Sequence, residues 1–168
     1  NETVNYPNEY QLESIRADIG TALRDFLSDA DNGWICRHSN LQLSLRYSPK
    51  FKPDAARIES GQPINIRSAE ALIRCNYAGY DLSPNIVTSI AYDYGVLPAL
   101  DRYIVRTIYS EVAHKLRCTF NVSYATLENP QELIKLYALI EHEQREMALR
   151  ERQGDHHVRD GENRRTGP

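Results

Sequence analysis

Five apolar residues recur at every fourth position in one stretch of the chain, at Leu100, Ile104, Ile108, Val112 and Leu116. This spacing places them on one face of an α-helix. Tyr103, Val105 and Tyr109 widen that face, so the helix would be apolar over much of its circumference. We therefore predict a central core helix that begins at Pro98 and runs to about Leu116.

Other segments carry helical periodicity together with start and stop signals. A Ser, Asn or Asp cap followed by proline favours a helix start, and glycine favours a stop. These signals predict further helices over residues 8–28, 68–78, 83–94 and from 130 onward. Residues 68–78 are included because Ser68 can cap a helix and Gly79 can end it, with Ala71, Leu72 and Cys75 facing inward.

One short segment shows the period of a strand instead of a helix. Leu41, Leu43, Leu45 and Tyr47 alternate with polar residues, as in a half-buried strand. The prolines and glycine within residues 48–66 make that segment a long loop. The fold class predicted is thus mainly α: a single all-alpha domain of about five helices with a short strand or hairpin at most.

The two ends of the chain differ in composition from its middle. Residues 1–7 resemble an extended arm, and residues 8–153 form the predicted helical domain, with 48–66 as its long loop. Residues 154–168 are polar, small or charged except for Val158, so we expect an extended or disordered charged tail. No internal repeat is visible.

Composition excludes several classes of protein. The chain has a net charge of −3, which argues against coating nucleic acid through bulk positive charge. No apolar run approaches the length of a membrane span, so we expect no membrane partner. Three cysteines lie about forty residues apart and form no disulfide framework. These features predict a protein of the cytoplasm or of a virion interior, and not a secreted one.

The sequence contains one candidate catalytic or metal-binding pair. Glu111 and His114 have the ExxH spacing used in di-metal helical bundles. A second ExxH copy, a nucleophile elbow and a phosphate loop are all missing from the sequence. We therefore expect no catalytic residues, no metal and no cofactor, and keep a small enzyme built around this pair as a third alternative.

Tyrosine is the most unusual component, at eleven residues against three Phe and one Trp. Several tyrosines lie near arginines in sequence, and a face of rings and guanidinium groups can hold single-stranded nucleic acid. The alternative is that half of these rings lie in the core. The nucleic-acid-binding residues that this pattern predicts are Arg74, Arg102, Arg106, Tyr77 and Tyr80.

The helix that starts near Pro130 loses its apolar face after Ile140 and continues as a charged segment, so we expect it to project from the body and bind a partner. The predicted partner-binding residues are Arg145, Arg150, Arg152, Arg164 and Arg165. Our first hypothesis is a non-enzymatic structural subunit that forms a homo-oligomer or belongs to a multi-subunit complex. A viral coat or nucleocapsid-type protein that contacts RNA or DNA would be one such subunit. The runner-up is a helical adaptor that binds another protein through this C-terminal helix.

Overall fold

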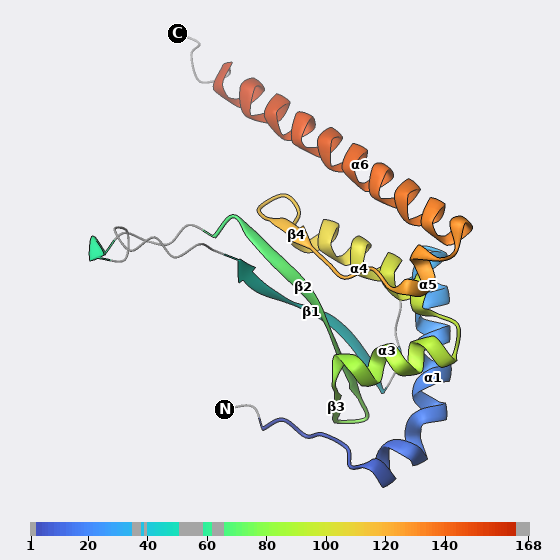
Figure 1. The fold of residues 1–168 in the computed structure, drawn as a ribbon. Helices are drawn as coiled ribbons and strands as arrows, with labels where there is room; N and C mark the ends of the chain where they lie inside the picture. Colours follow the sequence, from blue (N-terminus) through green and yellow to red (C-terminus); the bar gives the residue numbers. More distant parts are fainter. Residues whose placement is uncertain (1–2, 35–37, 39, 51–58, 62–65, 164–168) are drawn as a thin grey trace.

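The computed structural model describes residues 3–34, 38, 40–50, 59–61 and 66–163, with side chains up to 154. Within these residues five helices combine with a four-stranded sheet in an α+β fold (Figure 1). The prediction of a mainly α, all-alpha domain is therefore wrong. The error arises at residues 68–78, which we predicted as a helix and which form strand β2 (Ser68–Tyr77).

Strand β2 is held by its neighbour β1 (Leu41–Lys50), which confirms the predicted strand and extends it by three residues. The two strands pair antiparallel over their full length, from Leu41 opposite Tyr77 to Lys50 opposite Ser68. The sequence of β2 contains Ala, Glu, Leu and Arg, which favour a helix locally. Ladder pairing with β1 outweighs that local preference, because it buries alternate residues of both strands.

Two short strands complete the sheet on the side of β2 away from β1. Strand β3 (Tyr80–Leu82) pairs antiparallel with the end of β2, and β4 (Arg117–Thr119) pairs in parallel with its start. A two-residue turn with positive φ at Ala78 (49°) and Gly79 (88°) joins β2 to β3. Both residues of a tight hairpin turn require this left-handed backbone, which glycine adopts without strain.

Helices cover one face of the sheet. Helix α1 (Glu9–Asp31) starts at a capping box formed by Asn8 and Gln11, and α3 (Pro84–Asp93) starts at the Ser83 cap, so both predicted helices are confirmed. The central helix α4 (Leu97–Glu111) is also present but ends earlier than predicted. Residues 112–115 turn back on themselves through the Lys115 to Val112 bond of 2.8 Å, so that the chain can enter β4.

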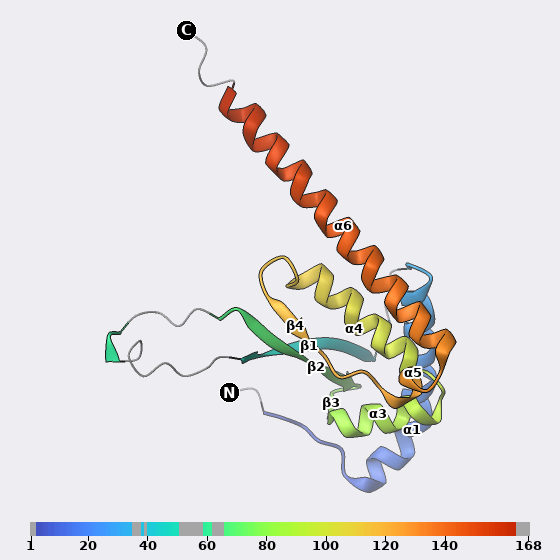
Figure 2. The same cartoon turned by 45° about the horizontal axis from the view of Figure 1, so that its top comes forward.

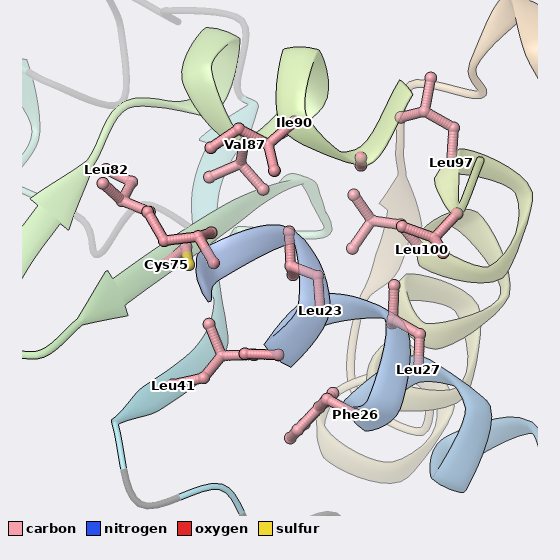
Figure 3. Packing of buried hydrophobic residues seen from close by; sticks show 14 of the residues in the cluster. Leu23, Phe26, Leu27, Leu41, Cys75, Leu82, Val87, Ile90, Leu97 and Leu100 are labelled. Atoms are coloured by element: carbon pink, nitrogen blue, oxygen red, sulfur yellow. The ribbon is translucent and has the colours of Figure 1, made fainter. Parts of the chain in front are cut away.

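The hydrophobic core lies between these helices and the sheet (Figure 3). Leu23 and Leu27 of α1 face Val87 and Ile90 of α3 and Leu100 of α4. On the sheet, the inward-facing residues are Leu41, Ala71, Cys75, Tyr77 and Leu82. The opposite face of the sheet carries mainly polar residues, as in antiparallel sheets that leave one face to solvent.

The C-terminal part of the chain consists of α5 (Tyr124–Leu127) and the long helix α6 (Pro130–Asn163). The first turns of α6 contact α4 and α5, and the rest projects beyond the body (Figures 1 and 2). The helix runs through most of the segment for which we expected an extended tail, residues 154–168. No helix in the described part of the chain is both long enough and apolar enough to cross a bilayer.

Candidate functional site

Two of the predicted nucleic-acid-binding arginines are engaged in ion pairs. Arg102 donates to both carboxylate oxygens of Asp31, at 3.0 and 2.8 Å, and also to Glu132. Arg106 donates to Asp31 at 2.9 Å. This network joins the end of α1 to α4 and to the first turn of α6, so it positions α6 on the body.

The network also changes the ionisation of its members. Partial burial tends to raise the pKa of Asp31, but the hydrogen bonds and charges of Arg102 and Arg106 outweigh it and hold that pKa below its usual value. The same contact with Asp31 raises the pKa of Arg102. Both groups stay charged at neutral pH, and their charges are satisfied within the protein.

The other three predicted nucleic-acid-binding residues do not lie together with these arginines. The Tyr77 side chain is buried in the core, with 7% of its surface exposed. Tyr80 lies in β3, while Arg74 lies on the polar outer face of β2. The structure therefore does not gather the five residues into the single face that the sequence suggested.

The Glu111/His114 pair is not arranged as an ExxH metal motif. Helix α4 ends at Glu111, so His114 lies in the following turn instead of one turn further along the same helix. Glu111 accepts a hydrogen bond of 2.7 Å from the Tyr47 hydroxyl. Burial and this carboxylate both raise the pKa of Tyr47. Among the described residues no three His, Cys, Asp or Glu side chains gather as a metal site would require.

A buried carboxylate that the sequence analysis missed lies next to Arg102. Asp101, with 3% exposed, accepts hydrogen bonds from the backbone and hydroxyl of Ser123 (3.0 and 2.7 Å) and from the Thr126 hydroxyl (2.6 Å). These bonds fix the start of α5 against α4. The sequence offers no signal for this role, because Asp101-Arg102 looks like an ordinary exposed charge pair.

Helix α6 exposes both apolar and charged side chains. Leu136 is buried against the body, whereas Ile134 and Tyr137 are 61% and 63% exposed. Of the predicted partner-binding residues, Arg145 lies 3.8 Å from Glu141 of the preceding turn. Arg150 and Arg152 are exposed and form no ion pair among the described residues. Arg164 and Arg165 lie outside the described residues.

An apolar groove of about 510 Å³ separates α6 from the body. Its body side is formed by the second half of α4, the turn that follows and β4, including Tyr109, Leu116 and Phe120. Its other side is formed by Ile140 and Met147 of α6. The groove also contains Cys118, and partial burial raises the pKa of that thiol.

Comparison of the sequence with protein-family models and with curated proteins finds no match.

Proposed function

We propose that this protein is a non-enzymatic assembly subunit that pairs with a second copy of itself through α6, the two helices running antiparallel. The observation that carries the proposal is the order of charges along the projecting part of the helix. Glu141 and Glu143 precede its middle and Arg150 and Arg152 follow it, with Arg145 and Glu146 at the centre and Glu151 between the two arginines. Glu143, Arg150 and Arg152 form no ion pair among the described residues, and the side chains of the Glu141–Arg145 pair are about three-quarters exposed to solvent.

These four residues form two stripes on the helix. Glu141 and Arg152 are eleven residues apart, close to three turns, so they share one side of α6. Glu143 and Arg150 are seven residues apart, close to two turns, and share the other side. The residues between the stripes are Ile140, Gln144, Met147, Ala148 and Glu151, which gives a mixed seam with a single carboxylate towards its C-terminal end.

This pattern is self-complementary in one orientation only. In an antiparallel pair about a two-fold axis, each side of a helix faces the same side of its copy. Both Glu/Arg pairs are centred between residues 146 and 147, so Glu141 meets Arg152 of the copy and Glu143 meets Arg150. A parallel pair would bring Glu141 level with Glu143, and Arg150 level with Arg152, and like charges repel.

The apolar groove supports the same occupant. Ile140 and Met147 belong to the seam between the stripes and also line the groove. A second α6 that packs on the seam would therefore cover groove residues of the body, such as Tyr109 and Phe120. Covering this surface removes apolar area from water, which favours association.

Charge-swap variants test this arrangement directly. We expect the wild-type chain to form a dimer when its mass is measured by light scattering on a sizing column. The variant Arg150→Glu/Arg152→Glu should be monomeric, and so should Glu141→Arg/Glu143→Arg, because each places like charges opposite one another. Mixing the two variants should restore a dimer, since each then supplies the charges that the other requires.

Two results would count against the proposal. A wild-type chain that stays monomeric at high concentration would remove it. A dimer that survives both charge reversals would show that α6 is not the interface. The variant Glu13→Arg/Asp18→Arg, which reverses two exposed charges of α1 and none of α6, serves as the matched control and should leave the dimer intact.

One observation favours the adaptor as a second candidate. Tyr124 and Leu127 of α5, together with Ile134 and Tyr137 of α6, are large, apolar and exposed on two helices that pack together. Such residues are typical of surfaces that bind another protein. A wild-type monomer that binds a different protein, and loses that binding in Tyr137→Glu, would support the adaptor.

A further inference from the structure

The outer face of the sheet carries a concave polar site that the proposed pairing of α6 does not use. In the described structure the helices pack against the inner face, so the outer residues of β1 and β2 have no helix over them. At the β3 end the N-terminal arm, residues 3–7, lies beside this face (Figure 1). The distal half of α6 lies far from it in both views (Figures 1 and 2).

Hydrogen bonds hold the arm in place. The Asn5 backbone donates to the Asp81 carboxylate at 3.0 Å and accepts from the Asp81 backbone at 2.8 Å. The Asn5 side chain donates to the Gly79 carbonyl at 3.2 Å. The bonds from Asn5 and Asn76 lower the pKa of Asp81, so its carboxylate is charged and already engaged.

A cavity of about 360 Å³ lies between this arm and the outer face of the sheet. Arg46 of β1 and Arg74 of β2 line it, together with Gln42, Ser44 and Asn76. Arg74 pairs in register with Ser44, and Arg46 pairs with Leu72, so the two arginines are diagonal neighbours, roughly 7–8 Å apart between backbones. A planar anion placed between them can accept hydrogen bonds from both guanidinium groups.

Neither arginine is neutralised within the described part of the chain. No carboxylate forms an ion pair with Arg46 or Arg74; the Arg74 side chain donates to the Ile73 carbonyl at 3.0 Å. Glu70, on the other diagonal of Arg46, accepts from the Asn121 amide at 3.3 Å. The two guanidinium groups repel each other across the diagonal, and a bound anion would relieve that repulsion.

The arm adds an aromatic ring to the same cavity. Tyr6 lines the cavity with 65% of its surface exposed, so one side of the ring remains available for stacking. Guanidinium groups for phosphate and a ring for a base are the two elements that bind single-stranded nucleic acid. The cavity volume is in the range of small-ligand sites, which suits one nucleotide and not a duplex.

We propose that this cavity binds a nucleotide unit of single-stranded nucleic acid, with its phosphate on Arg46 and Arg74 and its base on Tyr6. This site differs from the face predicted from sequence, since it shares only Arg74 with that set. The cavity lining holds two arginines and one carboxylate, that of Asp81, which leaves a local surplus of positive charge in a protein whose net charge is −3. Sequence preference is not required, because stacking and phosphate contact tolerate every base.

Fluorescence anisotropy of a labelled ten-nucleotide single strand tests the proposal on the full chain at low salt. We expect Arg46→Gln and Arg74→Gln each to weaken binding about tenfold or more, because each removes charged hydrogen bonds to phosphate. Tyr6→Ala should weaken binding about fivefold or more, whereas Tyr6→Phe should keep it. Arg67→Gln removes the same charge from an exposed position before β2, at the end of the sheet opposite β3, and should bind as the wild type does.

Competition identifies the ligand chemistry. A nucleoside monophosphate should displace the labelled strand at a much lower concentration than inorganic phosphate, and an unlabelled duplex should compete poorly. Equal competition by inorganic phosphate would overturn the stacking role of Tyr6, and tight competition by duplex would overturn the single-strand assignment. The Arg46 side chain is exposed, so Arg46→Gln should leave the fold intact, which circular dichroism can verify. If this folded variant binds the strand as tightly as the wild type does, the proposed site is wrong.

Discussion

At the scale of single residues, Asp31 links three helices: it lies at the end of α1, contacts α4 directly and is connected to α6 through Arg102. Its carboxylate accepts from Arg102 and Arg106 of α4, and Arg102 in turn donates to Glu132 of α6. Burial works against the charged form of Asp31, but the two arginines prevail and its pKa lies below the ordinary value of 3.8. A group whose pKa is lowered on folding stabilises the protein above its unfolded pKa, and this contribution is lost as the pH falls through the folded pKa.

The substitution Asp31→Asn should therefore destabilise the protein near neutral pH and matter less in acid. We expect the free energy of unfolding to fall by about 1 kcal/mol at pH 7, a modest value because solvent screens the partly exposed pair. The difference from wild type should begin to shrink as the pH falls below about 4, where the carboxylate of the unfolded chain takes up a proton, and should be lost once the pH has passed the lower pKa of the folded state. Urea unfolding at several pH values measures this difference.

Asp18→Asn, which removes the same charge from the exposed surface of α1, isolates the effect of net charge and supplies the control. An Asp31→Asn deficit that stays constant down to pH 3 would contradict the role assigned to the carboxylate.

At the scale of elements, the packing of α1 on α3 depends on a glycine within a helix. A Cβ at Gly20 would lie 2.2 Å from Cε2 of the Tyr94 ring, a distance that requires the ring to move. The same ring is covered by the guanidinium group of Arg24, at 5.2 Å from the ring centroid. In an exposed helix, Gly→Ala would instead be favourable by about 1 kcal/mol.

The substitution Gly20→Ala should consequently have effects of opposite sign on the free energy of unfolding in the wild-type and Tyr94→Ala backgrounds. We expect it to destabilise the wild-type protein and to stabilise the Tyr94→Ala variant, in which the ring is gone and helix propensity alone remains. The coupling in a double-mutant cycle of urea unfolding measures the clash. Equal effects of Gly20→Ala in both backgrounds would show that Tyr94 moves aside at no cost.

The elements that the sequence predicted correctly carry their signals locally. The capping residues Asn8 and Ser83 and the proline at residue 84 lie within a few positions of the helices that they start. Strand β2 differs, because the partner that makes it a strand is β1, which ends at Lys50, and seventeen residues separate it from the start of β2. Local propensity at Ala69, Glu70 and Leu72 favours helix, and nothing in the segment itself reveals the ladder.

At the scale of the whole molecule, the candidate sites also differ in whether their residues lie close together in sequence. The partners of Arg102 are 71 and 30 residues away in sequence, so its engagement in an ion-pair network was not predictable from its neighbours. The cavity between the arm and the sheet combines residues of the arm, β1 and β2, which only the fold brings together. The charged stripes of α6, in contrast, lie within one helix and follow from sequence once that helix is known to project.

The division into body and projecting helix leads to a prediction for the whole molecule. The core cluster contains no residue beyond Ala125, and the last buried apolar residue of the described chain is Leu136. A chain that ends at Ile140 keeps these residues and the Arg102 network, but lacks both charged stripes of α6.

We expect this shortened chain to fold with a melting temperature that does not depend on protein concentration. The full-length dimer should melt at a temperature that rises with concentration, because pairing stabilises the folded state by mass action. Calorimetry at two concentrations measures both quantities. A shortened chain that is unfolded would show that the distal helix belongs to the body, and one that still dimerises would move the interface away from α6.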